Sequence, residues 1–392
     1  GSGTGAALLY HYKNGSWTPY TISPRIPGVS YLTAISMDSP TDGWAVGGYY
    51  QGPAFDARAM RSLLLHYDGT AWHQVTGPIN DALGSVYMLS ATDGWALTEI
   101  TRDNVPEILH FDGTSWHAQG VPAGTYSNAN DMLNFTGLAA LPDGEAWVGV
   151  VLFPQGNTST SSGNSASSST GPGQEGSSGQ PAYPSSVILH YTGGAWTVQT
   201  RLANAIVNGI GVSSQGDGWA VGQNIAAPPP GAPQPGTSAQ APLFLRYFGG
   251  QWTPVNVTLP GDGTVQYMVG SVSLLSPTDV WVVGMTETTT TTTMQNSQGG
   301  STGTQFSVPQ GAVALLHFDG SGWTAHAGPS LPANALPSLL DSSFTSSNNG
   351  WAVGSLTTFT NTQSGTGGAM PQPNGVPLVL HYTNGVWSRY TL

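Results

Sequence analysis

Cysteine is absent from this chain of 392 residues, and charged residues make up only 7% of it. The absence of cysteine excludes disulfides, thiolate zinc sites and cysteine nucleophiles. Lys13 is the single lysine, and 8 basic residues stand against 20 acidic ones for a net charge of -12. Such a chain cannot neutralise a run of phosphates, so nucleic-acid binding is excluded. No run of about 18 apolar residues occurs, which predicts that nothing in the chain spans a membrane.

Tryptophan, by contrast, is abundant, and all 13 copies fall in two recurring motifs. The first motif reads Asp-Gly-Trp-Ala-Val-Gly at 42–47, and the second reads Leu-His-Tyr-x-Gly-x-x-Trp at 65–72. A residue type used only at equivalent positions of a repeat is predicted to have a structural, packing role. The tryptophans of the first motif are Trp44, Trp95, Trp147, Trp219, Trp281 and Trp351, and those of the second are Trp17, Trp72, Trp116, Trp196, Trp252, Trp323 and Trp387.

Each repeat predicts four short antiparallel strands, which we name A to D. In the first repeat, strand A covers 32–37, strand B begins after a Pro- and Gly-containing turn, strand C covers 63–67 and strand D begins at Trp72. The C–D turns are Asn-Gly, Asp-Gly or Gly-Gly pairs. Such pairs predict two-residue hairpins in which both central residues have positive φ. No segment longer than a turn has helical periodicity.

Four-stranded units repeated in this way predict an all-β fold, a β-propeller, because a propeller arranges its sheets radially and leaves few open edges. We expect a single domain over 1–392, with 1–22 forming an N-terminal C–D half-blade whose hairpin covers 7–21. Its A–B pair lies upstream or is supplied by another chain, and the ring has six or seven blades. A two-stranded unit is marginal alone, so the hairpin must dock. The six complete repeats span about 31–76, 83–118, 136–200, 206–256, 267–327 and 338–392.

These motifs resemble the repeats of photosystem II assembly/stability factor-like propellers, which belong to the wider group of Asp-box (bacterial neuraminidase repeat) propellers. The resemblance covers nearly the whole chain and implies the propeller fold. It departs from a strict Asp-box because the Ser-x-Asp-x-Gly spacing is missing, and Thr192, Phe248 and Thr383 replace the aspartate. The group includes hydrolases, assembly factors and surface proteins, so the resemblance implies no single activity.

Two polar positions recur once per repeat, and both have a structural explanation. A histidine stands on strand C in six units and Arg246 in the seventh, too far apart around a ring to share a metal ion, so we expect hydrogen bonds between neighbouring sheets. The aspartates of the A–B turns are expected to bond their own backbone two residues on. We therefore predict no metal and no cofactor. The histidines are His11, His66, His110, His190, His317 and His381, and the aspartates are Asp42, Asp93, Asp143, Asp217 and Asp279.

The best candidate for a ligand site is a polar patch on the face that carries the B–C loops. Five of the eight basic residues map to this face, in D–A connections and B–C loops, and could hold a carboxylate or a sugar. A sialidase-like glycoside hydrolase is the weakest alternative, because it needs two carboxylates about 5–10 Å apart. The patch consists of Arg25 and Arg201 in D–A connections and of Arg58, Arg61 and Arg102 in B–C loops, joined by Asp56, Asp103, Glu107 and Tyr126.

Four Ser/Thr/Gly/Pro-rich segments interrupt the repeats between strands B and C, at about 153–184, 223–241, 285–311 and 355–376. They are either tolerated insertions or loops that carry O-linked sugar or contact partners. We interpret the chain as a non-enzymatic extracellular or cell-surface module that binds a protein or polysaccharide through the B–C loop face. The alternative is a self-assembling surface or filament subunit, in which the N-terminal hairpin pairs with a neighbouring copy.

Overall fold

The computed structural model describes an all-β protein, and no helix long and apolar enough to cross a membrane occurs in its described residues. The described residues are 5–22, 25–26, 28–52, 56, 59–99, 106–126, 131–154, 184–225, 240–260, 265–292, 306–332, 335–360 and 372–391.

Six four-stranded antiparallel sheets, blades 1 to 6, follow one another along the chain, each in the order A-B-C-D, after a two-stranded hairpin. The hairpin is β1 (Leu9–Lys13) and β2 (Ser16–Tyr20). Blade 1 is β3 (Ser30–Ser39), β4 (Asp42–Tyr50), β5 (Met60–Tyr67) and β6 (Trp72–Val75). Blade 2 is β7 (Leu83–Ser90), β8 (Asp93–Thr98), β9 (Glu107–Phe111) and β10 (Trp116–Gly120). Blade 3 is β11 (Met132–Ala140), β12 (Ala146–Phe153), β13 (Ser185–Thr192) and β14 (Ala195–Leu202).

The second half of the ring repeats this order. Blade 4 is β15 (Ala205–Val212), β16 (Gly218–Ile225), β17 (Gln240–Phe248) and β18 (Gln251–Pro254). Blade 5 is β19 (Gln266–Ser276), β20 (Asp279–Thr292), β21 (Phe306–Phe318) and β22 (Trp323–Ala325). Blade 6 is β23 (Ala335–Ser346), β24 (Asn349–Thr360), β25 (Gln372–Thr383) and β26 (Val386–Tyr390).

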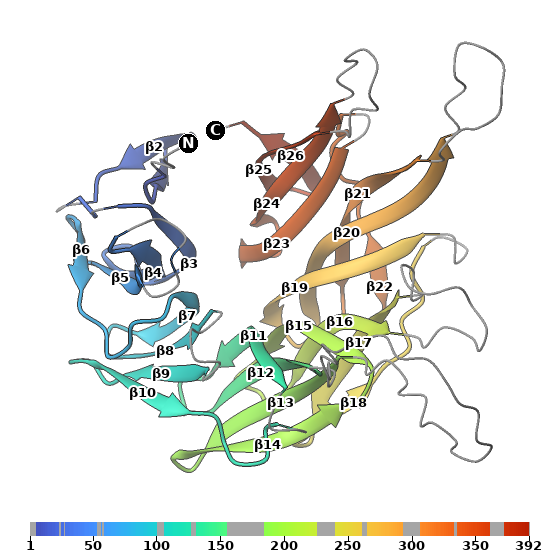
Figure 1. Ribbon diagram of the computed structural model, residues 1–392. Helices are drawn as coiled ribbons and strands as arrows, with labels where there is room; N and C mark the ends of the chain where they lie inside the picture. The colour runs from blue at the N-terminus through green and yellow to red at the C-terminus, as the bar shows by residue number, and fades with distance from the viewer. Residues whose placement is uncertain are drawn as a thin grey trace, which may run out of the picture.

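The blades form a ring, and the predicted β-propeller is confirmed. The first strand of each blade lies toward the centre, and the hairpin lies between blade 6 and blade 1 with both chain ends beside it (Figure 1). The core lies between successive blades: the cluster of Trp44, Val46 and Leu64 from blade 1 includes Val86 and Met88 from blade 2. Apolar surface on both faces of a sheet is thereby removed from water, which is why the strand C segments are apolar runs.

The final glycine of the Asp-Gly-Trp motif is explained by a β-bulge. The register of β3 and β4 shifts between Leu32 and Ala34, opposite Gly47. A Cβ atom on Gly47 would overlap the carbonyl oxygen of Tyr31, and the equivalent Gly222 would overlap that of Ile206. In blades 1, 4, 5 and 6 the bulge therefore requires a residue without a side chain at this point, whereas blades 2 and 3 have Thr98 and Val150 opposite the bulge.

The C–D turns are of two kinds, which corrects the expectation of a single two-residue type. Asn14 and Gly15 both have positive φ, as the two-residue hairpin requires. In the Asp-Gly turns only the glycine does, and β5 and β6 are joined by a four-residue turn. The carboxylate of Asp68 accepts hydrogen bonds from the backbone of Thr70 and Ala71 and closes that turn. An aspartate in this position uses its side chain in place of a second left-handed residue.

The recurring histidines and turn aspartates bond each other within one sheet, which corrects both expectations made for them. His66 Nε2 lies 3.2 Å from Asp42 Oδ2 in blade 1, and His317 Nε2 lies 2.9 Å from Asp279 Oδ1 in blade 5. Asp143 alone among the described turn aspartates bonds the backbone as predicted, by accepting from the amide of Glu145 at 3.1 Å. The pairs tie strand B to strand C, because cross-strand partners face each other on the same side of the sheet.

Two strand pairs extend into segments that the sequence suggested were loops. β20 continues to Thr292 and pairs with β21 through Thr292 and Phe306, inside the predicted loop 285–311. β24 continues to Thr360 and pairs with β25 from Gln372, inside the predicted loop 355–376. Threonine is β-branched and favours extended backbone, so a threonine run prolongs strands that already pair.

Candidate functional site

The contact between successive blades follows one pattern. The strand B tryptophan lies over the strand C histidine of its own blade, or over Arg246 in blade 4, and its edge or face meets one or two aromatic rings of the next blade. Trp95 thus lies 4.2 Å from the ring centroid of His110, 4.8 Å from Tyr191 and 5.2 Å from Trp196. The corresponding inter-blade pairs are Trp44 with Phe111 and Trp116, Trp219 with Phe318 and Trp323, and Trp281 with Tyr382 and Trp387.

The hairpin enters this pattern on the side of blade 6. Trp351 of β24 packs on Tyr12 of β1 at 5.0 Å and on Trp17 of β2 at 5.6 Å. The hydroxyl of Tyr390 on β26 donates to the carbonyl oxygen of Gly15 at 2.7 Å. Through these contacts the hairpin takes the place of strands C and D of a further blade. The ring therefore has seven positions, and one of them holds only two strands among the described residues.

The pattern breaks on the other side of the hairpin, where it meets blade 1. Tyr67 and Trp72 occupy the two positions that receive a tryptophan at the other junctions. Here the ring of Tyr20 meets Tyr67 edge-on at 5.7 Å, and their hydroxyls lie 2.9 Å apart. No strand B tryptophan packs on Tyr67 and Trp72 within the described chain, because the hairpin contributes only β1 and β2.

A pocket of about 440 Å³ lies at this junction, between the hairpin, β3 and the outer strands of blade 1. We call it the hairpin pocket. This volume is within the range of about 300–1,000 Å³ for ligand sites, which are mostly apolar and aromatic. Leu9, Ile35, Met37, Asp38, Ser39 and Pro40 line it together with seven aromatic side chains, Tyr10, His11, Tyr12, Trp17, Tyr20, Tyr67 and Trp72.

Two apolar side chains of β3 are exposed at this pocket although their equivalents in blade 2 are buried. Ile35 is 54% exposed and Met37 is 43% exposed. Val86 and Met88 of blade 2 are each 6% exposed. They are equivalent to Ile35 and Met37 because they pair with the same positions of the Asp-Gly-Trp strand of their own blade. The preceding blade covers Val86 and Met88 with its strand B. No such strand precedes blade 1 in the described residues, so the pocket exposes side chains whose equivalents in blade 2 are buried in the core.

One carboxyl group, that of Asp38, belongs to the pocket lining. Burial, together with the neighbouring Asp42 carboxylate, raises the pKa of Asp38 above its ordinary value. Asp42 itself is paired with His66. The pocket therefore combines an aromatic wall with one carboxyl group that is neutral over a wider pH range than an exposed aspartate.

Only some of the residues predicted to form a patch on the B–C loop face lie in the described part of the chain. Arg58, Arg102 and Asp103 lie outside the described residues. Arg61 belongs to strand β5 and Arg201 to strand β14, so neither is in a connection as predicted.

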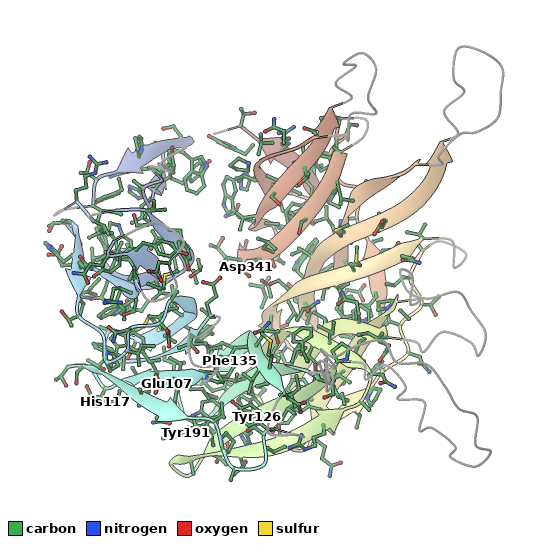
Figure 2. The ribbon with its side chains drawn as sticks, in the orientation of Figure 1. Glu107, His117, Tyr126, Phe135, Tyr191 and Asp341 are labelled. Atoms are coloured by element: carbon green, nitrogen blue, oxygen red, sulfur yellow. The ribbon has the colours of Figure 1, made fainter. Side chains whose placement is uncertain are left out.

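The other members of the patch have local roles. The guanidinium of Arg201 donates to the carbonyl oxygen of Thr125 at 3.2 Å, next to Tyr126, which packs against the core of blades 2 and 3. Glu107 begins β9, where burial and then Asp81 raise the pKa of its carboxyl group (Figure 2). Arg25 is exposed, and the carbonyl oxygen of Asp56 accepts a hydrogen bond from the amide of Ala59 at 2.9 Å. The ligand-binding role of this patch stays a prediction.

The hairpin pocket was missed by sequence reasoning, although a signal for it exists. The second motif occurs seven times and the first only six, so one tryptophan of the ring has no counterpart.

The described residues contain no group of three or more His, Asp or Glu side chains placed to hold a metal ion.

No family model matches the chain, and no curated protein matches it. Among solved structures, the chain is similar to a photosystem II assembly factor, YCF48 bound to D1 peptide, with 13% identity, a TM-score of 0.44, and coverage of 97% of this chain and 83% of that one. It is also similar to the six-bladed fucose-binding lectin of the fungus Aleuria aurantia, with 10% identity, a TM-score of 0.46, and coverage of 92% and 95%.

A polysaccharide lyase, a PL25 ulvan lyase, shows a likeness of the same order, with 9% identity, a TM-score of 0.45, and coverage of 96% and 84%. These neighbours include binding proteins and an enzyme, and the identities are too low to carry function from any of them to this chain. Membership of the Asp-box group stays a prediction.

Proposed function

We propose that this protein is a non-enzymatic binding module, acting outside the cell or at its surface, that recognises a protein partner at the hairpin pocket. The observation that carries the proposal is the exposure of Ile35 and Met37 where the equivalent Val86 and Met88 are buried. Exposed apolar side chains gathered beside aromatic rings are typical of protein-binding surfaces. Tyrosine and tryptophan are also the residues enriched in the well-packed centres of protein interfaces.

The chemistry of the pocket supports binding without catalysis. Its lining includes a single carboxyl group, Asp38, whereas glycoside hydrolysis uses two carboxyl groups on opposite sides of the bond that breaks. The low charge of the whole chain and its single lysine support an extracellular location. Self-assembly, the second function predicted from the sequence, would use the same pocket if a copy of this chain were the partner.

A peptide library displayed on phage tests the proposal, because it samples many sequences and does not require the partner to be identified first. We expect selection on the full chain to enrich peptides with apolar and aromatic residues. We expect the double variant Ile35→Asp/Met37→Asp to weaken their binding at least about tenfold, because two charges would have to be desolvated in the interface. Phe248→Asp is the matched control, since Phe248 is 73% exposed and ends strand β17 of blade 4, away from the hairpin pocket. Enriched peptides that bind the double variant and the wild type equally would refute the proposed site.

A further inference from the structure

We propose that the hairpin pocket receives a β-hairpin, which completes the two-stranded unit as its strands A and B and presents the sequence Asp-Gly-Trp. This inference rests on the proposed function, that the pocket binds a protein. Three separate features of the pocket define the occupant: an open strand edge, an aromatic cage and an uncovered apolar strand.

The open edge belongs to β1. β1 pairs with β2 from Leu9↔Tyr20 to Lys13↔Ser16, and no other described strand pairs with it. In every complete blade the equivalent strand C pairs with a strand B, as β25 does with β24 through Gly350↔Tyr382. An unpaired edge offers a row of amides and carbonyls to an added strand, which a sugar or a small apolar ligand would leave unsatisfied. The edge therefore favours an extended polypeptide.

The aromatic cage specifies an indole on the added strand. At the other junctions one indole lies over the strand C histidine or arginine of its own blade and packs on the next blade, as Trp281 stacks on His317 at 4.3 Å and packs on Tyr382 at 4.6 Å. At the hairpin pocket both halves of this site are present. His11 lies on β1, and Tyr67 lies across the pocket on β5.

An aspartate two residues before the indole would pair with His11. The strand C histidine or arginine of each other blade has a polar partner at the start of strand B, for example Arg246 with Asp217 at 2.8 Å and His110 with Asp93 at 2.9 Å. Within the described residues no carboxylate lies within ion-pair distance of His11. Asp-Gly-Trp supplies the acid and the indole with the spacing that the other blades use.

The uncovered strand is β3, and it explains why a strand pair fits better than one strand. In blade 2 the corresponding side chains pack with Trp44 and Val46 of strand B. The amide of Met88 also donates to the hydroxyl of Ser36 on strand A of the preceding blade, at 2.9 Å. The A–B pair together thus covers this face. In the hairpin pocket the same cover would bury Ile35 and Met37.

The test uses a cyclised peptide with the sequence of residues 83–98, which is the A–B pair of blade 2, added to the full chain. Cyclisation is needed because a free two-stranded hairpin is marginal in water. We expect saturable binding by calorimetry, a higher melting temperature of the protein, and slower hydrogen exchange at the β1 amides. A peptide carrying Trp95→Ala is expected to bind about tenfold more weakly or worse. Phe248→Asp is expected to bind the peptide as the wild type does, and Ile35→Asp/Met37→Asp is expected not to.

Other outcomes overturn the proposal. If library peptides bind the pocket but the cyclised hairpin does not, strand addition is wrong and the proposed function stands. If neither binds, the proposed function is wrong as well. If binding survives Trp95→Ala in the peptide, the cage does not select an indole.

Discussion

The junction between blades 1 and 2 and the junction between the hairpin and blade 1 are built from the same kinds of residue, yet only the first is closed. At the closed junction, Trp44 packs on Phe111 and Trp116, and Met88 is buried. At the open one, Tyr67 and Trp72 receive no indole in the described chain, and Met37 is 43% exposed. Whether an apolar residue on a propeller strand is buried in the core or exposed as a binding surface thus depends on the unit that precedes its blade in the ring. Four predictions break or sharpen this contrast.

The largest effect is expected at the centre of the closed junction. Trp44→Ala removes a ring that is 3% exposed and contacts two aromatic rings of blade 2. We expect it to lower the free energy of unfolding by about 3–5 kcal/mol, since the lost burial and the cavity both count. Urea denaturation, monitored by tryptophan fluorescence, measures this loss in the free energy of unfolding. A loss below about 1 kcal/mol would mean that the junctions do not hold the ring together.

The second prediction compares the two methionines directly. Met88→Ala is expected to cost about 2–5 kcal/mol, the range for a buried side chain. Met37→Ala, at the equivalent place in the open junction, is expected to cost less than about 1 kcal/mol, because its side chain is already in contact with water. Both values come from urea denaturation under one set of conditions. Equal losses would show that Met37 is covered in solution and that the pocket is closed.

The third prediction concerns Tyr20 of β2, whose ring meets Tyr67 edge-on at the open junction. Tyr20→Phe removes the contact of 2.9 Å between the two hydroxyls and the hydrogen bond that the Tyr20 hydroxyl donates to the carbonyl oxygen of Thr70 at 3.3 Å, and it keeps the ring. We expect a loss of about 1–3 kcal/mol, because each hydrogen bond contributes about 0.5–1.5 kcal/mol net. We also expect no weakening of peptide binding, because the aromatic wall is intact. Tyr20→Ala is the comparison that should open the pocket further and lower the melting temperature more.

The smallest effect is expected from Asp38, whose equivalent in blade 2 is Leu89. Because folding raises the pKa of Asp38, its contribution to stability is greatest below the ordinary carboxyl pKa and is lost as the pH rises through the raised value. Asp38→Asn should therefore raise the melting temperature at pH 7, and this gain should vanish near pH 3. Asp143→Asn, in an exposed turn, serves as the control. A gain that is the same at both pH values would contradict the raised pKa.

The comparison also shows what sequence could and could not predict. The motifs Asp-Gly-Trp and Leu-His-Tyr located the strands, because each combines a turn signal with large apolar side chains that are expected to be buried. The polar pairs were misplaced, since a repeat shows that His66 and Asp42 recur but not that they face each other within one sheet. The hairpin pocket was missed because Ile35 and Val86 look alike along the chain. Their difference lies in the neighbouring blade, which only the closed ring reveals.

Hydrogen exchange at two pairs of matched amides tests the open seventh position most directly. By the alternation of antiparallel pairing, the amides of Tyr10 and Tyr12 point away from β2, toward the open edge of β1. The equivalent amides of Leu380 and Tyr382 point toward β24, with which β25 pairs. The open edge predicts exchange at Tyr10 and Tyr12 at least about tenfold faster than at Leu380 and Tyr382, because unpaired amides exchange without any opening of the sheet. Equal protection at all four amides would show that β1 already has a partner strand and would contradict the account.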